Sequence, residues 1–187
     1  MNKIEIGALN FSYPMPTLLV GSKVGGRPNF ITVAFCTAVQ MKPPVLAISL
    51  SKKRYTNAGI KENGTFSVCV PSTDLLGAAD YCGIYSGKEV DKSDVFEIFY
   101  GKLETAPMIK NCPICIECKL TNVIDILAED EIFLGDVVET YTEEQYLTNG
   151  VPDLLKVKPF ILSVRDKRYL SLGENIGTSW EEGKKFK

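Results

Sequence analysis

Short apolar runs rich in β-branched and aromatic residues alternate with glycine, proline and polar turns along the first half of the chain. Runs of this kind predict β-strands. The predicted strands cover residues 17–22, 29–40, 45–50 and 65–71. The Gly-Gly pair and the proline within 23–28 are typical of a hairpin connection. The pattern therefore indicates an antiparallel arrangement.

Two segments have helical character instead. Residues 55–63 are followed by Gly64, the residue type that most often ends a helix. Residues 72–82 begin with Ser72, Thr73 and Asp74, any of which could cap a helix start. The polar stretch 86–97 predicts a loop with a short helical turn.

The second half again predicts strands. Residues 112–130 read as largely extended, 131–144 as a strand kinked at Gly135, and 159–173 as a last strand. Many short strands with few helices predict a mainly β protein, an antiparallel barrel with added helices. A length of 187 residues suits a single domain over 1–187.

Composition narrows the function classes. Apolar residues make up 45% and charged residues 24%, so a core can form without disulfides or metals. The net charge of −2 and the lack of a basic stripe disfavour nucleic-acid binding, and no apolar run is long enough to span a membrane. Six cysteines without an export signal at the N-terminus predict a reducing compartment, the cytoplasm.

The chain contains no histidine. Serine–histidine and cysteine–histidine catalysis are therefore excluded, together with histidine-ligated zinc. Any catalytic chemistry has to come from other side chains or from a bound cofactor.

Cys112, Cys115 and Cys118 follow a C-x-x-C-x-x-C spacing, which raises the question of an iron–sulfur or zinc site. In an extended segment, side chains alternate between faces, so Cys115 and Cys118 point in opposite directions. Cluster-binding segments are compact and usually include a fourth nearby cysteine. We therefore expect buried structural cysteines and no metal site. A thiol-redox role for Cys112 and Cys115 remains an alternative.

Residues 48–64 carry the strongest functional signal. A strand ends there, and Ser51, Lys53, Arg54 and Thr56 precede or open a helix. Hydroxyls, fixed positive charge and backbone N–H groups at a helix start form a phosphate site. The alternative is a solvated basic turn with a threonine N-cap.

Two further segments have weaker signals. Residues 26–37 could lie flat against a planar ring, although such a stretch is more often a core strand. Residues 86–96 contain glycine and two lysines and could close over a ligand, although they also suit a plain surface loop.

The order of several segments resembles the flavoredoxin branch of the flavin reductase-like, FMN-binding split-barrel family. The matching segments are PMPTLLVGS, GRPNFITVAF, KPPVLAISLSKKRYTNAGIKENGTFSVCVP, SGKEVDKSDVFE, CPICIECKL, EIFLGDVV and YLSLGENIG. This resemblance covers almost the whole chain and implies an antiparallel split barrel that binds FMN at a homodimer interface. It also implies that CPICIECKL is a core strand.

The resemblance further implies roles for individual residues. Ser51, Arg54 and Thr56 would hold the FMN phosphate, with Lys53 nearby. The isoalloxazine ring would lie along the following residues: Asn29, Thr32, Val33, Ala34, Phe35, Ser49 and Leu50. Asp130 stands where many related reductases have a histidine near the nicotinamide, which leaves the electron donor open. Cys36, Lys92 and Asp130 are candidates for the substrate side of the ring.

We therefore expect an FMN-binding redox protein, an oxidoreductase supplied with electrons by NAD(P)H or by a ferredoxin-type protein. One alternative is an NAD(P)H-dependent flavin or ferric reductase. Another, from a different class, is a non-catalytic flavin-binding module. The chain has no G-x-G-x-x-G fingerprint, so it contains no Rossmann nicotinamide domain.

Overall fold

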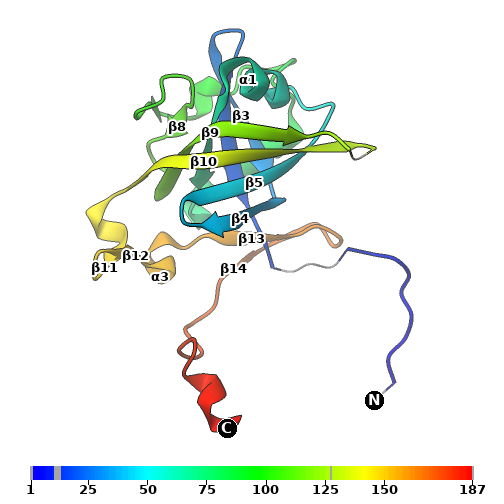
Figure 1. Ribbon diagram of the computed structural model, residues 1–187, viewed down its shortest axis with the longest axis vertical. Helices are drawn as coiled ribbons and strands as arrows, with labels where there is room; N and C mark the ends of the chain where they lie inside the picture. Colours follow the sequence, from blue (N-terminus) through cyan, green and yellow to red (C-terminus); the bar gives the residue numbers. More distant parts are fainter. Residues whose placement is uncertain (1, 11–13, 127, 187) are drawn as a thin grey trace.

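The central feature is a seven-stranded antiparallel sheet, seen in the computed structural model, which describes residues 2–10, 14–126 and 128–186 (Figure 1). Across the sheet the strands run in this order: β3 (Arg27–Val33), β2 (Leu18–Val24), β6 (Thr65–Val70), β9 (Ile114–Ile124), β10 (Asp130–Thr142), β5 (Pro44–Ser51) and β4 (Cys36–Met41). All six neighbouring pairs are antiparallel, as predicted.

The sheet curls until its two edges meet. The edge strands β3 and β4 are separated only by Ala34 and Phe35, and three peptide units span about 10–11 Å at most. The backbone N–H of Ser49 on β5 donates to the carbonyl of Phe35 at 2.9 Å. The connection between the edges therefore closes the sheet into a barrel.

This closure corrects one prediction. Residues 29–40 do not form one strand, because β3 ends at Val33 and β4 begins at Cys36 on the opposite edge. A tight turn, in which the N–H of Cys36 donates to the carbonyl of Ala34 at 3.1 Å, separates the two. The residues at the turn are apolar, so the hydrophobic pattern alone does not reveal it.

The predicted hairpin and helix end are confirmed. Gly25 and Gly26 have φ values of 57° and 79° and join β2 to β3, a conformation that glycine adopts without strain. Helix α1 (Thr56–Asn63) ends at Gly64, whose N–H donates to the carbonyl of Ile60 at 3.0 Å. Helix α1 packs closely on β2, since a Cβ at Gly59 would lie 2.1 Å from the carbonyl oxygen of Lys23.

The predicted helix at 72–82 is also present. It consists of a 3₁₀ turn, η1 (Thr73–Leu75), followed by α2 (Leu76–Ile84). Ser72 occupies the position before η1, but its side chain makes no capping hydrogen bond. The predicted loop 86–97 contains a turn at 86–90 and a short 3₁₀ helix, η2 (Ser93–Val95).

Two apolar clusters lie on opposite faces of the sheet. The barrel interior holds one set of buried residues: Leu18, Val20, Ile31, Val33, Ile48, Leu50, Ile60, Phe66, Val68, Cys118 and Phe133. An outer cluster contains Leu19, Phe30, Cys69, Ala79, Cys82, Met108, Ile109, Cys112, Cys115 and Phe160. Cys115 and Cys118 thus face opposite sides of β9, as predicted. The described residues include no group of histidine, cysteine or carboxylate side chains that could hold a metal ion.

The predicted strand at 159–173 is wrong in one respect, because it is a hairpin. Strands β13 (Phe160–Ser163) and β14 (Arg168–Ser171) pair with each other, and β13 also pairs with β1 (Met15–Pro16). Lys167 has a φ of 54° in the turn between them. The kink at Gly135 is confirmed by a register shift between β9 and β10. Position 127 of the predicted extended segment lies outside the described residues.

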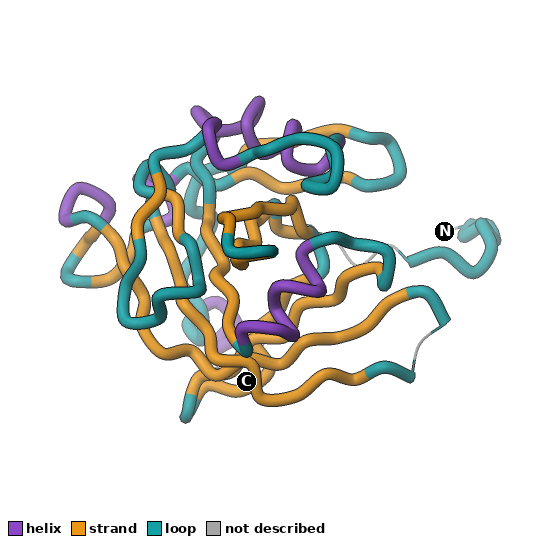
Figure 2. The backbone as a smooth tube through the Cα atoms, turned by 90° about the horizontal axis from the view of Figure 1, so that it is seen from above, coloured by secondary structure: helices purple, strands orange, loops and turns teal. Residues whose placement is uncertain are grey.

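The remaining elements are short. They are β7 (Ile98–Phe99), β8 (Met108–Ile109), η3 (Glu144–Tyr146), β11 (Leu147–Thr148), β12 (Val151–Pro152), α3 (Leu154–Val157) and η4 (Glu182–Phe186). Viewed from above, strands make up most of the body of the fold, and the helices are short segments between them (Figure 2). Among the described residues, every helix is too short or too polar to cross a lipid bilayer.

Candidate functional site

A cavity of about 310 Å³ lies where β5 turns into α1. Its lining residues come from four segments: Ile31, Ser51, Lys53, Arg54, Tyr55, Thr56, Cys82, Tyr85, Ser86, Gly87 and Lys92. The structure thus brings the predicted phosphate residues together with residues of α2 and of the 86–97 loop. We call this the cationic cavity.

The charge of the cationic cavity is one-sided. Lys53, Arg54 and Lys92 line it, and no carboxylate does so among the described residues. Lys92 is only 3% exposed, and its Nζ donates to the carbonyl oxygens of Tyr85 at 3.1 Å and Cys82 at 3.3 Å. An ammonium group has three protons, so one donor remains for an anion in the cavity.

Burial also sets the protonation of this region. Desolvation lowers the pKa of Lys92, the nearby Cys82 thiol opposes that shift, and the charge of Arg54 adds to it. Burial raises the pKa of Cys82 to about 11. Near neutral pH the thiol is therefore uncharged, and the positive charge in the cavity comes from the lysine and arginine side chains.

A buried polar network holds the turn that carries Ser51 and Arg54. The side-chain amide of Asn57 donates to the carbonyl of Ser51 at 2.9 Å and to Oε1 of Glu131 at 2.8 Å. Glu131 is 2% exposed, and its Oε2 accepts from Nζ of Lys61 at 2.5 Å. These bonds tie the end of β5, the start of α1 and strand β10 into one unit. Sequence reasoning missed both Asn57 and Glu131.

Thr56 does not cap the helix, so the N-cap alternative is wrong. Helix α1 begins at Thr56, the preceding residue is Tyr55, and no side chain caps this helix start. The hydroxyl of Thr56 instead accepts from Nδ2 of Asn29 at 2.7 Å. This bond attaches β3 to the start of α1, so Asn29 and Thr56 both help to shape the cavity.

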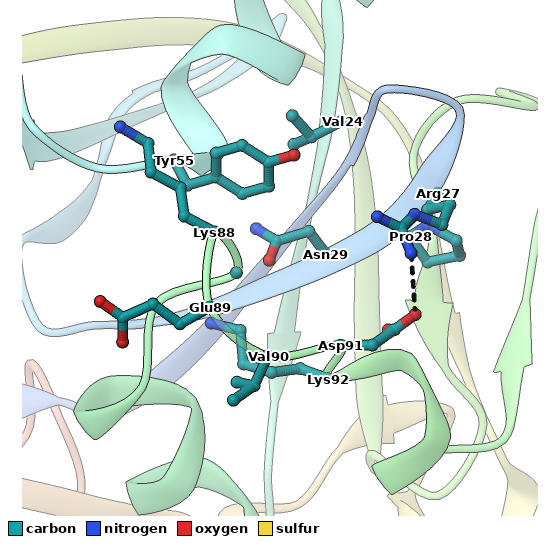
Figure 3. A pocket seen from close by; sticks show the side chains of 11 residues that line it. Val24, Arg27, Pro28, Asn29, Tyr55, Lys88, Glu89, Val90, Asp91 and Lys92 are labelled. Atoms are coloured by element: carbon teal, nitrogen blue, oxygen red, sulfur yellow. Dashed lines mark ion pairs between the residues drawn. The ribbon is translucent and has the colours of Figure 1, made fainter.

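A smaller pocket of about 180 Å³ adjoins the cationic cavity and shares Tyr55, Gly87 and Lys92 with it. In Figure 3, Asn29 lies between the ring of Tyr55 and the 87–92 loop. A Cβ at Gly87 would lie 2.0 Å from Oδ1 of Asn29, so only glycine allows this close approach. The 87–92 loop therefore lies against the cationic cavity. This position agrees with the interpretation in which the segment could close over a ligand.

A second cavity, of about 400 Å³, lies where β1 and the segment before it meet the turn between β3 and β4 and strand β5. Its lining is mainly apolar and comprises Asn10, Pro14, Met15, Pro16, Ala34, Phe35, Cys36, Thr37, Ala47, Ile48, Ser49 and Ile132. Cavities of this size commonly hold small molecules. We call it the apolar cavity. Ser49 and Ser51 project from the same face of β5, one at each cavity.

The other residues predicted along the ring lie in three different settings. Val33 and Leu50 are buried in the barrel core, so only their backbone groups could meet a ligand. Ala34 and Phe35 line the apolar cavity. Thr32 is half-buried, and its hydroxyl donates to the carbonyl of Ala79 on α2.

The three residues assigned to the substrate side lie in three different places. Cys36 lines the apolar cavity, and burial raises the pKa of its thiol to about 12. Lys92 lies in the cationic cavity beside Arg54. Asp130 pairs with Ser51 at the start of β10, whereas Ile132, two residues later, lines the apolar cavity.

Comparison with known proteins identifies the family. Residues 11–170 match the family model of the flavin reductase like domain. The chain belongs to the flavin reductase-like family. The predicted family resemblance is thereby confirmed. Within this family, the chain is 40% identical to the flavoredoxin from Methanosarcina acetivorans over 100% of both chains, with a TM-score of 0.97.

Two further relatives support the same placement. The flavoredoxin of Desulfovibrio vulgaris (Miyazaki F) is 34% identical, with 98% of this chain and 100% of that chain covered and a TM-score of 0.91. An uncharacterized protein of Archaeoglobus fulgidus is 26% identical over 97% of this chain and 98% of its own. The predicted antiparallel split barrel of the flavin reductase-like family is confirmed.

Proposed function

We propose that this protein binds FMN and carries electrons or hydride through it, as a flavoredoxin-like redox protein. The observation that carries the proposal is the cationic cavity beside the apolar cavity, linked along one face of β5 by Ser49 and Ser51. The 40% identity to a flavoredoxin over the full chain supports it.

The donor set of the cationic cavity fits a phosphate group. Lys53, Arg54 and Lys92 supply positive charge, and Ser51 supplies a hydroxyl. The first turn of α1 adds backbone N–H groups that no side chain caps. Thr56 contributes through its bond to Asn29, which fixes the shape of the cavity wall. We therefore assign Lys92 to phosphate binding and not to the substrate side of the ring.

The apolar cavity suits a planar ring. Ala34, Phe35 and Ser49 would border the isoalloxazine, and the backbone groups of Val33 and Leu50 could hydrogen-bond to its edge. Bound FMN supplies the ability to accept and release electrons. The chain itself binds the phosphate, orients the ring and shields part of it from water.

A homodimer would complete the site. Strand β4 is an edge strand, and Phe35, Val39 and Met41 on or beside it are exposed. Since exposed apolar edges are usually covered, a second copy could shield the ring there. Sedimentation equilibrium of the flavin-loaded protein should return twice the chain mass. The mass of a single chain would contradict the dimer.

An absorption spectrum of the purified protein tests the proposed function. We expect flavin bands that bleach anaerobically with a reduced ferredoxin-type protein, with NADH or with NADPH. Bleaching by a nicotinamide nucleotide with turnover favours the flavin or ferric reductase alternative. Bleaching by the protein donor alone favours a carrier. Flavin bands that no donor bleaches would indicate a non-catalytic flavin-binding module, and absence of the bands after adding FMN would contradict the proposal.

Raising the pH should weaken FMN binding through Lys92. Burial lowers the pKa of this lysine in the free protein, so its charge is lost at a lower pH than that of an ordinary lysine. Above that pKa the affinity should fall by up to about tenfold per pH unit, since one proton is linked to binding. Arginine stays charged over this range.

The measurement is the FMN dissociation constant between about pH 7 and about pH 10, where the phosphate stays a dianion. The control is Lys92→Met, whose weaker binding should lack this decline. Parallel declines in both proteins would assign the titration to another group.

A further inference from the structure

Three thiols form a cluster that the proposed FMN site does not use. Cys69 on β6 pairs in register with Cys115 on β9, and Cys112 lies just before β9. The Sγ of Cys115 lies 3.9 Å from the backbone carbonyl oxygen of Cys112, and each of the three thiols shifts the pKa of the other two. Their side chains are buried, with exposed fractions of 0%, 1% and 6% for Cys69, Cys115 and Cys112.

A cavity gives access to two members of this cluster. It has a volume of about 430 Å³ and is lined by Phe99, Lys110, Cys112, Cys115, Tyr141, Thr142 and Glu143. Cys69 lies behind them and does not line it. A small uncharged molecule that enters the cavity would therefore meet Cys112 or Cys115 first.

We propose that Cys112 and Cys115 are an oxidation site, at which hydrogen peroxide or a small hydroperoxide closes a disulfide between them. Cys112 lies in a turn outside the strand ladder, where its N–H donates to the carbonyl of Ile109 at 3.1 Å. Cys115 is fixed on β9, and its Sγ donates to the same carbonyl at 3.2 Å. The Cys115 thiol and the Cys112 backbone thus share one carbonyl acceptor, which holds the two cysteines close together.

The reaction balances with peroxide as the oxidant. A sulfur of the pair attacks one peroxide oxygen, the O–O bond breaks, and the second oxygen leaves as water with the thiol proton. The resulting sulfenic acid is attacked by the other sulfur, the S–S bond forms, and a second water leaves. The two thiols lose two electrons and two protons, and the peroxide is reduced to two waters.

Cys69 is the third thiol, and its surroundings favour a negative charge in the cluster. Burial opposes ionisation of Cys69, but hydrogen bonds from the thiols of Cys112 and Cys115 lower its pKa well below that of an ordinary cysteine. Charge in such a hydrogen-bonded group belongs to the group as a whole. Hydrogen bonds with the neighbouring thiols and burial raise the pKa of Cys112 and of Cys115, so the case for these two cysteines rests on their position at the cavity.

Intact-mass analysis of the reduced full-length protein, before and after hydrogen peroxide, tests the proposal. The expected product has lost two hydrogen atoms, and dithiothreitol restores the starting mass. Trypsin releases residues 111–119 as one peptide containing Cys112, Cys115 and Cys118. After peroxide and alkylation this peptide should carry one alkyl group, on Cys118.

Variants make the assignment specific. Cys112→Ser and Cys115→Ser should abolish the loss of two hydrogen atoms, whereas Cys69→Ser and Cys118→Ala should retain it. Cys118 is the matched control because it lies on the same strand but faces the barrel interior. A fully alkylated peptide after peroxide, or a disulfide containing Cys69 or Cys118, would overturn the proposal. The wild-type peptide map decides this even if a variant fails to fold.

Discussion

Replacing Arg54 with alanine should weaken FMN binding by about 10- to 150-fold. Arg54 lines the cationic cavity, in which no described carboxylate competes for its charge. A charge-assisted hydrogen bond to phosphate contributes about 1.5–3 kcal/mol, and each 1.4 kcal/mol is about a factor of ten in affinity. The measurement is a titration of the apoprotein with FMN, followed by the quenching of flavin fluorescence.

Lys52→Ala is the matched control for this experiment. Lys52 lies on the same turn, and its replacement removes the same unit of positive charge. It does not line the cationic cavity, and its Nζ lies 2.6 Å from the carboxylate of Asp125. Because surface charges contribute up to about 1 kcal/mol, the change should stay within about fivefold. Equal losses in both variants would point to a long-range charge effect, and unchanged affinity in Arg54→Ala would refute the assignment.

Local sequence could predict that the residues of the 51–56 turn lie together because they are contiguous. Ser51, Lys53, Arg54 and Thr56 lie within six residues of one strand-to-helix connection, and all four line the cationic cavity. The position of Lys92 could not be predicted in the same way. It enters the cavity because the 86–97 loop folds back against Asn29 and Tyr55, and this long-range contact leaves no periodic signal.

The network behind the site was missed, although one signal for it exists. Glu131 is in phase with Phe133 and Gly135 along β10, so alternation places its carboxylate among inward-facing residues. A charged residue in that phase needs partners, and Asn57 and Lys61 provide them. The identity of those partners depends on how α1 packs, which strand periodicity does not encode.

Barrel closure shows a different limit of sequence reasoning. The apolar run 29–40 contains no glycine or proline, so nothing in its pattern separates β3 from β4. The chain breaks here because β3 and β4, which follow each other in the sequence, lie at opposite edges of the sheet. By contrast, the opposite orientations of Cys115 and Cys118 followed from alternation alone, because β9 pairs with β6 without interruption over these residues.

Phe133→Ala should lower the free energy of unfolding by about 3–5 kcal/mol. The ring of Phe133 is fully buried in the barrel core, and truncation of such a ring removes burial and leaves a cavity. For a chain of this length, the melting temperature should fall by about 6–20 °C. Urea unfolding monitored by circular dichroism measures the loss, and a change below about 1 kcal/mol would contradict the core assignment.

Two comparisons separate this core effect from a cofactor effect. Phe186→Ala makes the same chemical change at a side chain that is 85% exposed, so it should alter stability by less than about 0.5 kcal/mol.

FMN at about 100 times its dissociation constant should add about 2.7 kcal/mol to any variant with an intact site. Phe133 lines neither the cationic nor the apolar cavity, so Phe133→Ala should regain this increment at the FMN concentration used for the wild type. Without FMN, Arg54→Ala should be as stable as the wild type. At the same FMN concentration, its free energy of unfolding should rise much less. If FMN did not stabilise Phe133→Ala, loss of the Phe133 ring would have disrupted FMN binding as well as the barrel core. The cationic and apolar cavities would then depend on the packing of that ring.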